Sequence, residues 1–176
     1  MRRLTSAVSL VDRVKGILGL GEGAQVEQQK GCLEVTVDAG SLRDAAARLK
    51  AAGFDHVKSV TAVDYPAKNQ IKVIYHASSM LDEELSKYMV GLATLVDRDN
   101  PVVPSLVGVW LSAEFHEREV YEYFGVRFDG HPDLRPLLLT PDLAAQKPLR
   151  KDFKVVEEDD YLKSTLEEYT STRRWV

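Results

Sequence analysis

The sequence contains a single cysteine, Cys32, among 176 residues. One thiol can neither close a disulfide within the chain nor hold an iron–sulfur cluster, which takes about four cysteine ligands. A lone cysteine beside a strand is most often a small packing residue. The shortage of cysteine therefore argues against a cluster-binding or disulfide-stapled domain, and it favours a reduced, cytoplasmic setting.

Long hydrophobic runs are also missing. The longest stretch without a charged residue, Asn100–Ala113, contains two prolines and is shorter than the about 20 apolar residues of a membrane-spanning helix. Near the N-terminus, Asp12 and Lys15 interrupt the apolar residues that follow Arg3, which is not the pattern of a signal peptide. We expect any association with a membrane to come through partner proteins.

An excess of positive charge is absent as well, because the net charge is −4. A protein that binds nucleic acid generally needs a basic surface, so we expect no nucleic-acid partner.

Two motif-like stretches lack a residue that their chemistry requires. The glycines of 19–23 are followed by Ala24 where a dinucleotide-binding loop would need glycine, and a helical pattern rather than a strand precedes them. His116-Glu117 would begin a zinc-protease motif only with histidine at 120, where the chain has Val120. We expect neither a nucleotide loop nor a metal site.

The residue patterns predict a single α+β domain over residues 1–125, with a mixed or antiparallel sheet and helices packed on one face. The predicted helices are 5–18, 42–52 and 113–124, and the predicted strands are 33–37, 56–63, 71–77, 88–96 and 106–111. The two strands 56–63 and 71–77 should form a hairpin around the turn 64–70.

The character of the chain changes from Val126 onward. Glycines, prolines and short apolar groups follow one another without periodicity, apart from a last helix predicted over 161–169. Such a long, weakly patterned stretch is unusual inside a compact domain, so we predict that 126–176 is an extended C-terminal arm that binds a partner. The alternative is that it packs back on its own sheet.

The helix predicted over 113–124 carries two kinds of charge. Glu114, Arg118 and Glu122 follow one another at four-residue spacing, which predicts a solvated face with favourable ion pairs. Glu117 instead falls among apolar residues, and a buried carboxylate needs a partner.

The candidate partners of Glu117 are Arg135, Arg150 and His131. The hypothesis is that an arginine and Glu117 clamp the helix to the arm. His131 precedes Pro132 in a turn, and we expect it to stabilise this turn by a hydrogen bond.

Residues 113–152 resemble the signature of the 30-kDa subunit family of respiratory complex I (NADH:quinone oxidoreductase), whose bacterial members are the C subunits, and of the homologous small subunit of energy-converting membrane-bound hydrogenase-type complexes. The matching positions are Glu117, Arg118, Glu119, Tyr121, Phe124, Gly125, Gly130, His131, Pro132, Asp133, Leu134, Arg135, Leu137–Leu139, Pro148, Leu149, Arg150, Lys151 and Asp152. The chain departs from the pattern at Pro136 and over residues 140–147.

The resemblance implies a non-catalytic scaffold subunit in the hydrophilic arm of an ion-translocating oxidoreductase. It implies no catalytic, cofactor-binding or metal residue on this chain; iron–sulfur clusters, and nickel–iron or flavin, would belong to partner subunits. The implied partners are a catalytic subunit like the large subunit of hydrogenases and the iron–sulfur subunits of the same complex. The implied location is peripheral, on the cytoplasmic side of the membrane.

The sequence leaves other functions open. The parent complex would reduce quinone or, alternatively, be an energy-converting membrane-bound [NiFe] hydrogenase or a related complex. A free-standing enzyme would use Glu117, His131 and Asp133 for acid–base chemistry. A stand-alone binding module would keep 126–176 ordered without partners.

Overall fold

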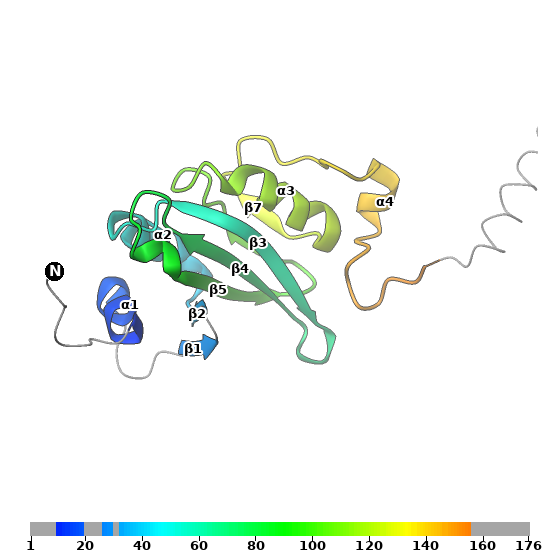
Figure 1. Ribbon diagram of the computed structural model, residues 1–176. Coiled ribbons are helices and arrows are strands. Elements are labelled where there is room, and N and C mark those ends of the chain that lie inside the picture. The colour runs from blue at the N-terminus through cyan, green and yellow to red at the C-terminus, as the bar shows by residue number, and fades with distance from the viewer. Residues whose placement is uncertain (1–9, 20–25, 30–31, 156–176) are drawn as a thin grey trace, which may run out of the picture.

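A five-stranded sheet forms the centre of the computed structural model, which describes residues 10–19, 26–29 and 32–155 (Figure 1). Its strands are β1 (Val26–Gln29), β2 (Cys32–Thr36), β3 (His56–Tyr65), β4 (Gln70–Ser78) and β5 (Met89–Asp97). They lie in the order β1-β2-β5-β4-β3, and all neighbours are antiparallel except β2 and β5, which are parallel. The predicted α+β class with a mixed sheet is confirmed.

The helices pack with the sheet around one hydrophobic core. They are α1 (Leu10–Leu18), α2 (Leu42–Ala51), α3 (Ala113–Phe124) and α4 (Pro141–Ala145), with 3-10 turns η1 (Ala39–Ser41), η2 (Pro66–Lys68) and η3 (Leu85–Lys87). Side chains from α1, α2 and α3 join those of β2 to β5 in one buried cluster. Alternate residues of β4 face this core, and Val73 and Tyr75 are fully buried.

The intervening residues of β4 point to the other face of the sheet, which carries polar pairs. Lys72 forms an ion pair with Glu34 of β2, and His76 lies 3.1 Å from the hydroxyl of Ser59 on β3. The alternation of apolar and polar residues is therefore what places one face of β4 against the core.

The predicted hairpin is confirmed, because β3 and β4 pair from His56↔Ser78 to Tyr65↔Gln70. The turn uses the 3-10 turn η2, and Asn69 ends it in the left-handed conformation with φ 49°. Asparagine tolerates this conformation better than most side chains.

The predicted strand 106–111 is wrong. The strand lies earlier, as β6 (Val102–Pro104), and pairs in parallel with β7 (Arg127–Asp129) in a second, two-stranded sheet. Residues 106–111 form turns that bury Leu106 and Trp110 at four-residue spacing, and the indole N–H of Trp110 donates to the carbonyl of Phe54 at 2.8 Å. Short apolar runs do not distinguish a strand from such turns.

The chain beyond α3 returns along that helix (Figure 1). Gly125 ends α3 with φ 72°, and Val126 and Phe128 enter the core, so the first residues assigned to the arm pack with the domain. The division of the chain at residue 125 otherwise stays a prediction. Residues 5–9 of the predicted first helix and the predicted helix 161–169 lie outside the described residues.

Over the described residues, no helix has both the length and the apolar character needed to cross a membrane.

Candidate functional site: helix α3 and the return segment

Glu117 is the buried centre of the signature. It lies on the inner side of α3 and its side chain is fully buried. Its carboxylate accepts hydrogen bonds from the Tyr75 hydroxyl on β4 at 3.0 Å, the Ser105 hydroxyl at 2.7 Å and the Leu106 backbone N–H at 2.8 Å. Glu117 thus joins α3 to the central sheet and to the loop after β6.

The burial predicted for Glu117 is confirmed, but the predicted arginine clamp is wrong. All three hydrogen-bond donors of this carboxylate are uncharged. Arg135 is 71% exposed, and the Arg150 guanidinium donates to the Phe124 carbonyl instead. Burial raises the pKa of Glu117, and the three hydrogen bonds partly oppose that rise.

Arg118 holds the chain that follows β7, here called the return segment (residues 130–152). Its side chain is buried, and its Nε and Nη2 donate to the carbonyls of Arg135 at 2.9 Å and Pro136 at 3.1 Å. Two backbone carbonyls that have no strand partner are satisfied in this way.

Glu122 holds the next residues of the return segment. Its carboxylate is 1% exposed and accepts the backbone N–H groups of Leu137 at 2.8 Å, Leu138 at 3.0 Å and Leu139 at 3.0 Å. Hydrogen bonds from several amides to one carboxylate are strong because the acceptor is charged.

The predicted solvated face of α3 is therefore wrong. Arg118 and Glu122 do lie on one side of the helix, as their spacing requires, but the return segment covers that side. An extended chain without a strand partner needs outside donors and acceptors for its backbone, and these two charged side chains supply them.

His131 connects the start of the return segment to α3. Its Nδ1 accepts the backbone N–H of Asp133 at 3.0 Å, so its Nε2 donates to the carbonyl of Glu114, which lies at 3.0 Å. These bonds fit the neutral imidazole with the proton on Nε2. The predicted role of His131 in fixing its turn is confirmed, and Gly130 beside it has φ 82°.

A charged cluster fixes the far end of the return segment to the β3–β4 hairpin. Arg98 donates to the buried Asp64 carboxylate at 2.7 and 3.1 Å and to Asp152 at 2.8 Å. Asp64 also accepts the backbone N–H of Lys151 at 2.8 Å. The Arg98 hydrogen bond is the main cause that lowers the pKa of Asp64.

The remaining signature residues divide between core and surface. Phe124 is buried, while Glu119, Tyr121 and Leu134 are half-buried. The exposed members are Pro132, Asp133, Arg135, Leu149, Lys151 and Asp152. The structure thus brings the helix and the return segment of the signature together, and leaves a minority of its side chains open to a partner.

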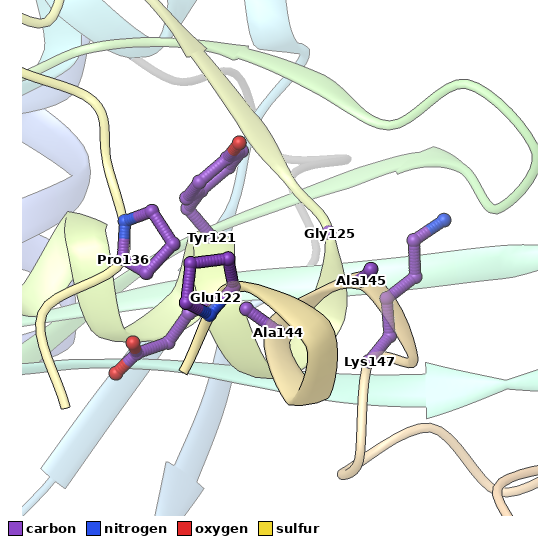
Figure 2. Close-up of a pocket in the computed structure, with 8 residues that line it drawn as sticks. Tyr121, Glu122, Gly125, Pro136, Ala144, Ala145 and Lys147 are labelled. Carbon is purple, nitrogen blue, oxygen red and sulfur yellow. The ribbon is translucent and has the colours of Figure 1, made fainter. Parts of the chain in front are cut away.

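A cavity of about 380 Å³ lies between α3 and α4 (Figure 2). Tyr121, Pro136 and Ala144 line it, together with Glu122 and Lys147. The Glu122 carboxylate is already occupied by the return segment. Outside residues 1–9, 20–25, 30–31 and 156–176, no group of three or more His, Cys, Asp or Glu side chains is arranged to hold a metal ion. The arrangement is suited to holding polypeptide chain together.

Four residues of this arrangement carried no signal in the sequence: Tyr75 and Ser105 beside Glu117, and Asp64 paired with Arg98. Tyr75 follows the apolar pattern of a buried strand, which hides its hydrogen-bonding role. Asp64 and Arg98 are far apart in the chain and meet only when β3, β4 and β5 align.

The geometry agrees with the outcome of comparison with protein families. The family described as "Respiratory-chain NADH dehydrogenase, 30 Kd subunit" matches residues 35–159, which include the whole of α3 and the return segment. The chain belongs to this family.

Curated members of the 30-kDa subunit family show the likeness at the sequence level. The C subunit of F(420)H(2) dehydrogenase from Methanosarcina mazei is 40% identical over 100 residues, which are 57% of this chain and 61% of that protein. The C subunit of NADH-quinone oxidoreductase from Moorella thermoacetica is 41% identical over 106 residues, or 60% of this chain and 68% of that one. The match to the Methanosarcina protein therefore spans less than two thirds of its length.

Solved structures extend the likeness of this 30-kDa family member to nearly the whole chain. A chain of the membrane-bound sulfane sulfur reductase, an archaeal respiratory membrane complex, has a TM-score of 0.70 and 27% identity, over 94% of both chains. The trypsin-resistant fragment of Nqo5 has a TM-score of 0.59 and 27% identity, over 70% of this chain and 96% of that one. This chain is therefore similar to subunits of multi-subunit respiratory complexes.

Proposed function

We propose that the protein is a non-catalytic scaffold subunit in the hydrophilic arm of a membrane-bound, ion-translocating oxidoreductase of the complex I type. In this role it docks on a catalytic subunit that resembles the large subunit of hydrogenases, next to the iron–sulfur subunits, and supports electron transfer to quinone.

The observation that carries the proposal is how the charged signature residues are used. Glu117, Arg118, Glu122 and His131 all hold this chain's own segments together. They build a surface and do not converge on a cavity where a reaction would occur.

The surface built in this way is apolar. A hollow of about 280 Å³ lies between α3 and β3, where Glu119 is the one charged side chain among the described residues of its lining, and Leu138 and Leu149 border it with 63% and 54% of their surface exposed. Phe115, one helical turn before Glu119, is 56% exposed. Large apolar side chains gathered around a hollow are typical of protein–protein contacts, so we assign the contact with the catalytic subunit to this docking surface.

The names of the relatives support a shared structural role. They refer to NADH–quinone, F(420)H(2) and sulfane sulfur as the substrates of the respective complexes. A subunit that is common to complexes with different substrates is better explained by assembly than by substrate chemistry. For the same reason the electron donor of the parent complex is not read from this chain.

Cofactors belong to the partners in this proposal. The clusters and the nickel–iron or flavin group of the parent complex would be held by subunits with the necessary ligands, since Cys32 is the single cysteine here. The chain would lie on the cytoplasmic side of the membrane and reach it through partner subunits. The equivalent place in a membrane-bound hydrogenase is the second candidate, because the sulfane sulfur reductase structure matches over 94% of the chain.

A free-standing acid–base enzyme is not supported by the geometry. The side chains of Glu117, His131 and Asp133 make separate contacts, with Tyr75 for the first, the carbonyl of Glu114 for the second and Arg135 for the third. A general acid and base must reach the same substrate, and these three groups do not face a common cavity among those found in the described part.

Purification of the tagged protein from native membranes tests the proposal. We expect a hydrogenase-large-subunit-like protein and iron–sulfur subunits to accompany it in equal amounts. The double substitution Leu138→Ser and Leu149→Ser should reduce the recovered catalytic subunit at least tenfold, because it removes two apolar contacts from the docking surface.

Leu111→Ser is the matched control, since Leu111 is 74% exposed and lies outside the hollow. Recovery of the full set of subunits with the double variant would contradict the assigned surface. Recovery of this chain alone from native membranes would contradict the scaffold role itself.

A further inference from the structure

The loop between β4 and β5 exposes two large apolar side chains. Met80 is 76% exposed and Leu81 is 91% exposed, the largest value among the exposed large hydrophobic residues of the described segments. The loop follows the end of β4, whereas the cluster of Asp64 and Lys151 lies near the start of that strand. A strand of nine residues is about 30 Å long, so the loop and this cluster lie at opposite ends of the sheet (Figure 1).

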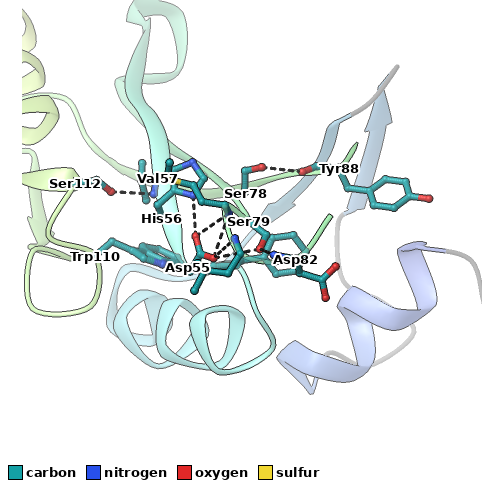
Figure 3. Close-up of polar contacts among 12 residues, drawn as sticks. Asp55, His56, Val57, Ser78, Ser79, Asp82, Tyr88, Trp110 and Ser112 are labelled. Atoms are coloured by element: carbon teal, nitrogen blue, oxygen red, sulfur yellow. Dashed lines mark hydrogen bonds and ion pairs between the residues drawn. The ribbon is translucent and has the colours of Figure 1, made fainter. Parts of the chain in front are cut away.

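This loop is held in one conformation by Asp55. The Asp55 carboxylate accepts the backbone N–H of Met80 at 3.0 Å, the backbone N–H of Leu81 at 3.0 Å and the hydroxyl of Ser79 at 3.2 Å, as Figure 3 shows for the surrounding polar contacts. His56 lies 2.9 Å from the same carboxylate. Burial opposes the ionised carboxyl, but these hydrogen bonds outweigh it and lower the pKa of Asp55 to about 2.

Asp82 fixes the other side of the loop. Its backbone N–H donates to the Ser79 hydroxyl at 3.0 Å, and its carboxylate accepts the backbone N–H of Glu84 at 2.9 Å and of Leu85 at 3.0 Å. Leu85 is 3% exposed and anchors η3 in the core. The backbone beneath Met80 and Leu81 is therefore held from both directions.

A rigid backbone under exposed apolar side chains lowers the entropy lost on binding, which is how preorganised contacts gain affinity. Methionine adapts its shape to an irregular pocket. Three acidic residues, Asp82, Glu83 and Glu84, follow directly and are exposed. Lys87 pairs with Glu84 at 2.7 Å, which leaves the loop with an excess of negative charge.

We propose that Met80 and Leu81 form a second docking element, which inserts into an apolar pocket bordered by lysine or arginine side chains on another protein subunit of the same complex. This inference rests on the scaffold role proposed above, but it uses a different surface. The scaffold would then contact its neighbours at both ends of its sheet.

Photo-crosslinking in the assembled complex tests the inference. Benzoylphenylalanine is introduced at position 81, and separately at positions 138 and 111, and the complex is irradiated in native membranes. We expect position 81 to crosslink to a single peptide of a neighbouring subunit, with basic residues beside the attachment point. Position 138 should crosslink to the catalytic subunit, and position 111 should not give a specific product.

The variant Met80→Ser with Leu81→Ser provides the second measurement. It should lower the salt concentration at which the crosslinked neighbour leaves the purified complex, while Leu111→Ser should not. The thermal midpoint of the isolated variant should stay within a few degrees of the parent, because both side chains are exposed.

The outcomes separate the two proposals. Crosslinks from position 138 without any from 81, or from 81 only to lipid or to a second copy of this chain, overturn the second docking element and leave the scaffold role standing. Crosslinks from neither position, together with recovery of this chain alone from native membranes, overturn the scaffold role as well.

Discussion

The hydroxyl of Tyr75 and the carboxylate of Glu117 are joined by a 3.0 Å hydrogen bond inside the core, where neither residue is reached by solvent. Tyr75 belongs to β4 and Glu117 to α3, so this bond links the central sheet to the helix that carries the signature. Burial and the nearby Glu117 charge raise the pKa of Tyr75 well above its ordinary value, which keeps the hydroxyl as the donor.

The first prediction concerns this link. Glu117→Ala should lower the free energy of unfolding by about 3 kcal/mol, because three buried donors lose their acceptor at once. Tyr75→Phe should cost about 1–2 kcal/mol, since it removes one of the three. Urea unfolding of both variants checks this, with Glu119→Ala as the half-buried control, and a loss for Glu117→Ala no larger than for that control would contradict it.

The second prediction concerns the return segment. Glu122→Ala should raise the hydrogen-exchange rates of the Leu137, Leu138 and Leu139 amides at least tenfold, because all three donate to this carboxylate. The amides of β4 should be unchanged. Exchange followed by mass spectrometry or NMR tests it, and unchanged protection at 137–139 would mean that Glu122 does not hold the segment.

The third prediction compares two ion pairs. Arg98→Ala should cost about 3 kcal/mol of stability, because it leaves the Asp64 carboxylate buried without its cation. Lys87→Ala removes a pair in which both side chains are more than half exposed, and it should cost under about 1 kcal/mol. Equal losses in denaturant unfolding would show that the burial of Asp64 is not what makes its pair important.

The fourth prediction is a pH dependence from Asp55. The folded-state pKa of about 2 lies below the ordinary value of 3.8, so the ionised carboxylate stabilises the fold above about pH 4. That contribution is lost as the pH falls from about 4 towards 2. Asp55→Asn should therefore unfold more easily than the parent at pH 6, and the difference should shrink by pH 2.

Denaturant unfolding at a series of pH values measures this difference. Asp64 also has a lowered pKa and weakens the parent and the variant alike on acidification, so the comparison isolates Asp55. A difference between the two proteins that is constant from pH 6 to pH 2 would contradict the prediction.

The sequence patterns were sufficient for most of the secondary structure. The hairpin of β3 and β4 and the helix α3 were predicted near their observed bounds, because alternation and helical periodicity follow directly from which residues face a core. The strand expected over 106–111 failed for the same reason in reverse. Its apolar residues are buried by turns, and a short run does not reveal which backbone buries it.

The charged residues of α3 show what periodicity cannot provide. Spacing correctly placed Glu117 on the buried side and Arg118 with Glu122 on another. Whether that second side meets water or chain depends on where residues 130–139 run, and their own pattern is too weak to indicate it. The predicted solvated ladder was therefore wrong although its helical geometry was right.

By itself, the sequence determined the family, the α+β class, the burial of Glu117 and the turn at His131, because each depends on local order or on a contiguous motif. Only the tertiary structure decided the partners: uncharged donors for Glu117, backbone groups for Arg118 and Glu122, and Arg98 for Asp64. Hydrogen bonds form between groups that folding brings within about 3 Å, and a one-dimensional pattern does not contain that proximity.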